Sequence, residues 1–140
     1  MKAYVDSSVI LRIIFGEKNA LKFPKNSDGF ITSEILKIEC FRTIDRMRQV
    51  LRISDDDVAD RHAALHEAIR SISFIKLTDV VLERACEPFP VVLKTLDAIH
   101  LSTALLWKQQ KKEDLLFLTH DEQLSKAARS VGFEVLGSSS

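Results

Sequence analysis

Short apolar runs alternate along this chain with longer stretches in which apolar residues recur every three or four positions. The first pattern is typical of buried strands, and the second of helices that cover a sheet with one face. We therefore predict strands at 3–5, 30–32, 74–77, 115–118 and 133–136. Helices are predicted between them: one follows the first strand at once and runs through Ile10 to Phe15, and the others lie at 33–53, 54–69, 78–87, 95–111 and 120–131.

Polar residues and glycine mark where several of these helices begin and end. Ser33 and Ser54 are predicted N-caps, because a serine hydroxyl accepts a hydrogen bond from a free amide of the first turn. Thr119 and Glu122 have the spacing of a capping box, and Gly132 follows the last helix as a stop. Strands that alternate with helices in this way predict an α/β fold with a mainly parallel sheet of about four to five strands.

The composition limits what kind of protein this is. Hydrophobic residues make up 46% of the 140 residues, which suits a single domain, predicted at 1–137, with a frayed tail at 138–140. No apolar run reaches the roughly 20 residues of a membrane-spanning helix. Asp6 and Arg12 interrupt the first apolar stretch, so we expect no signal peptide and a cytoplasmic protein.

Charge and cysteine usage exclude further classes. Twenty basic and twenty acidic residues cancel, whereas a protein that binds nucleic acid over a broad basic surface is strongly positive. Any affinity for nucleic acid must therefore come from local patches and bound metal ions. Cys40 and Cys86 lack the spacing of a zinc site or a disulfide framework.

Four acidic residues stand next to apolar segments, where a charge is costly. Asp6 directly follows the first strand, and Asp121 closely follows the strand at 115–118. Asp97 lies in the first turn of its helix, and Glu39 borders the apolar stripe of another. Residues that follow parallel strands gather at one edge of the sheet, and a carboxylate beside a core needs a partner or a cation. If the fold brings the four together, they form a candidate site for a hard divalent metal and for phosphodiester hydrolysis.

Each of these acids also has a simpler explanation. Asp6 would act as an N-cap, and Asp97 and Asp121 would be first-turn acids that interact favourably with a helix dipole. Glu39 would face solvent at the edge of its stripe. Acids that lie in other first turns or at the opposite end of the sheet are excluded from the site: Glu34, Asp55, Asp56, Asp57 and Asp114.

Basic residues close to these acids suggest a second set of contacts. Arg42 and Arg46 follow Glu39 on nearly the same helix face, where they would contact substrate phosphates or form salt bridges with neighbouring acids. Lys94 would reach a phosphate or remain a solvated loop residue. His100 lies on an otherwise apolar helix, and we expect a satisfied core histidine there rather than a metal ligand.

Four motifs follow one another along the chain in a recognisable order. They are Tyr4-Val5-Asp6-Ser7-Ser8, the helix from Ser33 to Glu39, the run from Leu96-Asp97-Ala98 to Ala104, and Leu118-Thr119-His120-Asp121 with Ala127-Ala128 and Gly132-Phe133 after it. In this order and spacing the sequence resembles the PIN domain, and within it the VapC-like toxin ribonucleases of toxin–antitoxin pairs. The resemblance covers residues 3–136.

This resemblance implies a three-layer α/β/α fold, a homodimer and a partner antitoxin that inhibits the enzyme. It also implies an acidic metal site with two supporting polar groups, made by Asp6, Glu39, Asp97, Asp121, Ser8 and Thr119. Two features depart from the family pattern. Lys94 stands where an arginine is frequent, which should alter phosphate contact, and the polar stretch 109–114 lengthens the link to Asp121.

Together these observations predict a Mg²⁺- or Mn²⁺-dependent endoribonuclease, since ligands that are all oxygen suit these ions. Metal-activated water would hydrolyse the RNA phosphodiester bond. Two alternatives remain: a PIN-type nuclease of RNA processing or decay outside a toxin system, and a non-catalytic module that binds RNA or protein. A phosphatase with Asp6 as nucleophile fits less well, because Ser8 stands where such enzymes carry a second aspartate.

Overall fold

A five-stranded parallel sheet organises the protein. The computed structural model describes residues 1–138, in which six helices flank this sheet. The strands are β1 (Lys2–Val5), β2 (Phe30–Ser33), β3 (Ile72–Ile75), β4 (Leu115–Leu118) and β5 (Glu134–Leu136), in the order β3-β2-β1-β4-β5. All four strand pairs are parallel, which confirms the predicted α/β class.

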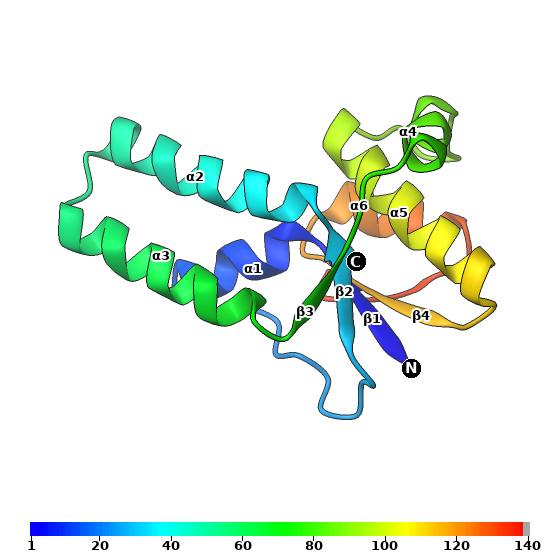
Figure 1. The fold of residues 1–140 in the computed structure, drawn as a ribbon, viewed down its shortest axis with the longest axis horizontal. Coiled ribbons are helices and arrows are strands. Elements are labelled where there is room, and N and C mark those ends of the chain that lie inside the picture. Colours follow the sequence, from blue (N-terminus) through cyan, green and yellow to red (C-terminus); the bar gives the residue numbers. More distant parts are fainter. Residues whose placement is uncertain (139–140) are drawn as a thin grey trace.

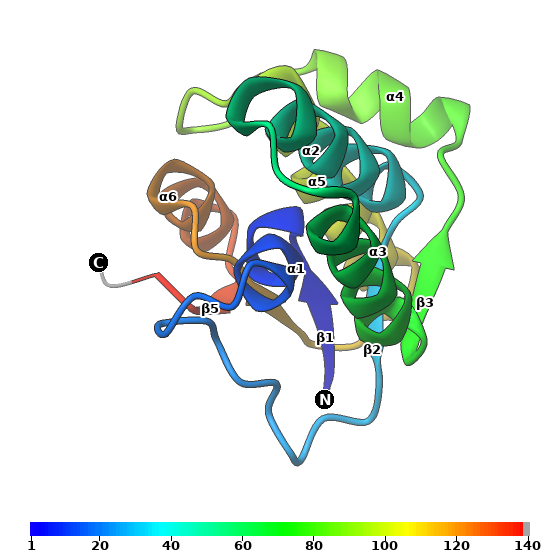
Figure 2. The same cartoon turned by 90° about the vertical axis from the view of Figure 1, so that its left-hand side faces the viewer.

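The helices form a layer on each side of the sheet. One layer contains α1 (Ser7–Ile14), α2 (Ile35–Leu51) and α3 (Asp55–Ile69), and the other contains α5 (Thr95–Lys111) and α6 (Glu122–Ser130), with α4 (Asp79–Cys86) packed against α5. Figures 1 and 2 show these layers from two sides, with α2 and α3 projecting beyond the sheet in Figure 1. This is the three-layer arrangement that the resemblance implied.

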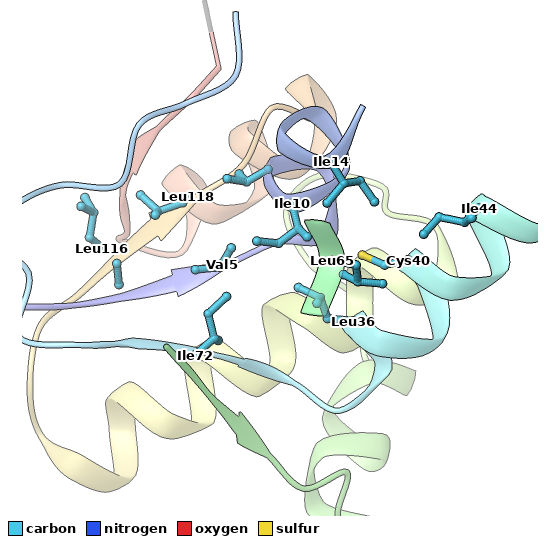
Figure 3. Packing of buried hydrophobic residues seen from close by; sticks show 12 residues of the cluster. Val5, Ile10, Ile14, Leu36, Cys40, Ile44, Leu65, Ile72, Leu116 and Leu118 are labelled. Carbon is cyan, nitrogen blue, oxygen red and sulfur yellow. The ribbon is translucent and has the colours of Figure 1, made fainter. Parts of the chain in front are cut away.

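Two apolar clusters join the layers to the sheet. Strand residues alternate between them: Val5 and Leu118 pack with α1, α2 and α3, whereas Tyr4 and Phe117 pack with α5 and α6. Figure 3 shows the first cluster, in which helix residues such as Ile10 meet the strands. β4 is buried on both faces, as its continuous apolar sequence predicts.

The path of the chain creates a switch point between β1 and β4. The chain adds β2 and β3 on one side of β1 and later returns to add β4 and β5 on the other. The helices that follow the two central strands therefore diverge, α1 to one face and α6 to the other. In parallel α/β sheets such a divergence opens a crevice at the carboxyl ends of the strands, where ligands bind.

Two local predictions, the third strand and the Ser33 cap, were wrong. The third strand is 72–75 rather than 74–77, because Ile72 pairs with β2 and is buried, while the amide of Leu77 is bound by the Glu34 carboxylate at 2.7 Å. The first helix begins at Ser7, directly after β1 as predicted, and Asp6 caps it. Ser33 belongs to β2, although its hydroxyl still accepts a bond from the amide of Ile35.

Other helix boundaries agree with the sequence. Ser54 and Thr78 cap their helices with their side chains, and the helix at 95–111 has its predicted bounds. Residues 139 and 140 of the predicted tail lie outside the described range. Within that range, none of the helices has the length and apolar character needed to span a bilayer.

Candidate active site

Asp6 lies at the switch point, at the carboxyl end of the central strand β1. It directly follows β1, is 2% exposed, and caps α1. Its Oδ2 accepts hydrogen bonds from the hydroxyls of Ser8 at 2.6 Å and Thr119 at 2.8 Å. Both predicted supporting residues therefore contact this carboxylate, and Thr119 does so from the end of the neighbouring strand β4.

The second oxygen of Asp6 is in a different situation. Oδ1 is buried and has no hydrogen-bond partner among the described residues. The imidazole of His100 approaches it, but Nε2 stays 3.7 Å away. A buried carboxylate oxygen without a partner is costly, so this atom is a natural ligand for a cation.

Glu39 reaches the same region from α2. Its Oε1 lies 2.5 Å from Nε2 of His100, and its Oε2 accepts a hydrogen bond from the Ser7 hydroxyl at 3.2 Å. The Glu39 side chain is only 13% exposed. It is therefore held against the start of α1, and the alternative of a solvent-facing glutamate at the margin of the stripe is wrong.

Asp97 shows that the four carboxylates act on one another. Burial raises its pKa to about 6, and the charges of Asp6, Asp121 and Glu39 act in the same direction, while His100 opposes them. An isolated first-turn acid would instead be stabilised in its charged form by the helix dipole. Asp97 therefore lies within the field of the other three acids.

Asp121 has two roles in the structure. It is the N-cap of α6, where its Oδ1 accepts a hydrogen bond from the amide of Leu124 at 2.8 Å. The predicted capping box, with Thr119 as the cap, is therefore wrong: the Thr119 hydroxyl is used by Asp6 and by the amide of Asp121. The cap occupies one oxygen of Asp121, whose charge still acts on Asp97.

The chemistry of these residues fits a hard divalent cation, although the side chains are not closed around one. Within residues 1–138, no three His, Cys, Asp or Glu side chains lie close enough together to hold a metal ion in their present positions. Glu39 is engaged by His100 and Asp121 by its cap. The donors are nevertheless all oxygen, as Mg²⁺ and Mn²⁺ prefer, and Asp6 Oδ1 lacks a partner.

A groove of about 310 Å³ begins at Glu39 and runs between α1 and α2. Arg42 and Arg46 line it together with apolar side chains from both helices and Leu96. Arg42 also lies 3.8 Å from Asp45, which is the predicted salt-bridge alternative, but such exposed pairs contribute little to stability. Lys94 is exposed at the N-cap position of α5, three residues before Asp97.

Sequence reasoning missed part of the site. His100 is the buried, satisfied histidine that we expected, with Tyr4 bonded to Nδ1 at 2.6 Å, but its other nitrogen contacts Glu39. Ser7 was not singled out, although it supports the same glutamate. The position of His100 three residues after Asp97 was a signal, since residues at this spacing share a helix face.

Comparison with known proteins shows the family of the chain. A model of the PIN domain matches residues 3–130, which is most of the chain. The chain belongs to the PIN domain family. The resemblance read from the four motifs is therefore confirmed.

Two similar proteins come from Mycobacterium tuberculosis. The chain is 27% identical over 137 residues to the protein named ribonuclease VapC47 of strain CDC 1551 / Oshkosh, with 93% of this chain and 92% of the relative covered. It is 29% identical over 140 residues to ribonuclease VapC46 of strain ATCC 25618 / H37Rv, with 97% of each covered. Both alignments span nearly the whole of each protein.

Solved structures share the PIN fold at lower identity. A chain of the Rickettsia felis VapBC2 structure, bound to a promoter DNA fragment, superposes with a TM-score of 0.65 at 10% identity, covering 96% of this chain and 97% of the other. A toxin–antitoxin complex from Klebsiella pneumoniae gives a TM-score of 0.60 at 19% identity, with 96% and 95% covered. At these identities the likeness shows the three-layer fold.

Proposed function

We propose that this PIN protein is a Mg²⁺- or Mn²⁺-dependent endoribonuclease and the toxin of a toxin–antitoxin pair. The observation that carries the chemistry is the unpartnered Asp6 Oδ1, buried at the switch point beside a set of mutually interacting acids. A protein interior keeps such a group when a ligand satisfies it. The names of the two mycobacterial relatives support RNA as the substrate.

The four acids have distinct parts in this proposal. Asp6, Glu39, Asp97 and Asp121 would hold the metal, which when bound supplies charge stabilisation at the phosphate and an activated water. Ser8 and Thr119 fix Oδ2 of Asp6, so that the free oxygen is the one presented. In the absence of metal, burial and the neighbouring acids raise the pKa of Asp97 to about 6, and a bound cation would relieve this repulsion.

A covalent route through cysteine is not part of the proposal. Cys40 follows Glu39 directly, but burial raises the pKa of its thiol to about 12, and the charges of Glu39 and Asp6 act in the same direction. The thiolate is the reactive form of cysteine. Water is therefore the nucleophile that the site supports, with products that carry 5′-phosphate and 3′-hydroxyl ends.

The groove beside Glu39 is the proposed path of the RNA backbone. Arg42 and Arg46 line it and are exposed, so their guanidinium groups are available to phosphates. Lys94 would contact a phosphate on the α5 side. Local basic residues of this kind supply the attraction that a chain of zero net charge lacks elsewhere.

The proposal also includes assembly partners. We propose a cytoplasmic homodimer that binds an antitoxin, whose extended or helical segment lies near the acids and places a basic side chain among them. Both solved neighbours belong to toxin–antitoxin complexes by name, which supports such a partner.

Cleavage assays on purified protein freed of antitoxin test the nuclease proposal. We expect RNA to be cut with Mg²⁺ or Mn²⁺ and cleavage to stop with EDTA. Asp6→Asn should lose most activity while staying folded. The matched control is Asp56→Asn, an exposed first-turn acid of α3 far from the site in sequence, which should cleave as wild type does. Full cleavage by Asp6→Asn, with contaminating ribonuclease excluded, would overturn the metal-site assignment.

A further inference from the structure

His100 lies between the acidic site and the core, where no motif assigned it a role. Its side chain is completely buried on α5. Nε2 is 2.5 Å from Glu39 Oε1, and Nδ1 is 2.6 Å from the hydroxyl of Tyr4. Both ring nitrogens are thus committed, one to a site residue from α2 and the other to a strand residue of β1.

We propose that Tyr4 and His100 form a positioning pair that holds the Glu39 carboxylate in the orientation that the acid site requires. His100 is in this view a positioning residue, not a metal ligand. The catalytic consequence rests on the proposed nuclease function, whereas the contact itself does not.

The hydrogen bond to Glu39 is present whichever protonation state His100 adopts. Burial and the nearby Asp6 charge raise the pKa of Tyr4 well above its usual value, so its phenol keeps its proton. If His100 is neutral, that proton is donated to Nδ1, and Nε2 then carries the ring hydrogen toward Glu39. If His100 is charged, both nitrogens carry hydrogens. In each case Glu39 receives an N–H donor.

Glu39 needs such a donor because the groove beside it would also stabilise its carboxylate. The groove beside it contains Arg42 and Arg46, and Arg42 is three positions along the same helix. A released carboxylate would gain solvation and charge contacts by turning into this groove. The bond from Ser7 to Oε2 is longer, at 3.2 Å, so His100 makes the shorter contact that retains Glu39 beside Asp6.

The other end of the pair is rigid. Tyr4 is fully buried, and its ring stacks on Phe117 of β4 with centroids 5.2 Å apart. The orientation of Glu39 is therefore fixed relative to the two central strands, which also carry Asp6 and Thr119 at their ends. Hydrogen-bond partners behind a ligand typically contribute about 10–100-fold to metal affinity or activity.

The main test compares variants that keep or remove the donor. Tyr4→Phe/His100→Leu removes both polar partners together, so neither is left unsatisfied and the protein should fold with a similar Tm. Calorimetric titration of this RNA-free double variant with Mn²⁺ should give an affinity about 10–100-fold weaker than wild type. In RNA cleavage assays, the fold-decrease in kcat should be larger than the fold-change in KM. Wild-type Mn²⁺ affinity in the double variant would overturn the proposal.

Two further variants separate positioning from general effects on the core. His100→Gln places an amide nitrogen near the position of Nε2 and should recover most of the Mn²⁺ affinity. Ser102→Ala alters a buried side chain of the same helix whose hydroxyl has no hydrogen-bond partner among the described residues, and should match wild type. No recovery by His100→Gln, or an equal loss in Ser102→Ala, would show a merely structural role.

A measurement without metal or RNA tests the contact directly. In EDTA, nitrogen NMR of histidine-labelled protein should show a hydrogen-bonded Nε2–H of His100 that shifts clearly in Glu39→Gln. An unchanged His100 signal in that variant would overturn the positioning pair. If wild type cuts no RNA but the signal shifts, the nuclease proposal fails while the contact between His100 and Glu39 stands.

Discussion

The hydroxyl of Thr119 donates a 2.8 Å hydrogen bond to Oδ2 of Asp6, across 113 positions of sequence. The two residues follow β4 and β1, which are neighbours in register, with Val5 beside Leu118. The same hydroxyl accepts a bond from the amide of Asp121 at 3.0 Å. Thr119 therefore links two of the four acids through one oxygen atom.

Thr119→Val should damage the site more than its small change in shape suggests. It removes the Thr119 bonds to Asp6 Oδ2 and to the amide of Asp121, and a buried group left unsatisfied costs about 1–3 kcal/mol. We expect lower stability by urea denaturation and strongly reduced cleavage. Thr119→Ser keeps the hydroxyl and should retain most of both. Equal behaviour of the two variants would show that the hydroxyl is not the important group.

Asp97→Asn should relieve repulsion and weaken metal binding together. In EDTA this variant should melt at or above the wild-type temperature, because one of the mutually repelling charges is gone. Metal that binds only the folded protein, at about 100 times its Kd, adds roughly 2.7 kcal/mol, and the variant should gain less from Mn²⁺ than wild type. Melting curves with and without Mn²⁺ measure both effects. The same metal-induced shift in both proteins would mean that Asp97 is not a ligand.

The raised pKa of Asp97 predicts a pH dependence of stability in the absence of metal. The folded protein holds this proton up to about pH 6, whereas the ordinary value is 3.8. The stabilisation is therefore complete below about pH 4 and is lost as the pH rises through about 6. Denaturation in EDTA across this window should show the loss in wild type. Subtracting the stability of Asp97→Asn from that of wild type at each pH should isolate the loss that Asp97 causes. A difference that does not change with pH would contradict the raised pKa of Asp97.

The groove arginines should act on RNA binding rather than on chemistry. Arg42→Gln/Arg46→Gln should raise KM several-fold with little change in kcat. The salt dependence of RNA binding should also become shallower, by roughly 0.7 in log–log slope for each phosphate that the arginines no longer neutralise. The control is Arg48→Gln, an arginine of the same helix that lies 3.0 Å from Asp45 and does not line the groove. If Arg48→Gln changed KM and the salt dependence equally, the overall positive charge of the helix, and not the groove, would be responsible.

The proposed partners are tested by mass and by copurification. Light scattering at micromolar concentration should give the mass of a dimer, about twice 15.9 kDa. A small protein encoded beside this chain should copurify with it and inhibit cleavage. A monomer mass by light scattering would contradict the homodimer. Failure of the neighbouring gene product to bind would contradict the toxin role while leaving the nuclease chemistry intact.

The sequence predicted those parts of the site that depend on strand ends. Asp6 and Asp121 were found because the apolar runs before them are short and clear, and parallel strands bring their ends together. Thr119 was named as a supporting group only through the family resemblance. The contact between His100 and Glu39 was not predictable, since it joins two helices 61 positions apart whose packing depends on the whole sheet. The sequence assigned the N-cap of α6 to Thr119 instead of Asp121, because both residue types are good caps. Only the fold shows that the Thr119 hydroxyl is already bonded to Asp6.

The strand order β3-β2-β1-β4-β5 has a consequence for synthesis on the ribosome. Asp6 is synthesised more than a hundred residues before β4, which is the neighbour of β1 in the sheet. The pairing of β1 with β4 is needed to complete the sheet around Asp6, and domains generally fold as units. A nascent chain therefore lacks the complete set of four acids until translation has passed Asp121, so the nuclease that we propose would be inactive before then.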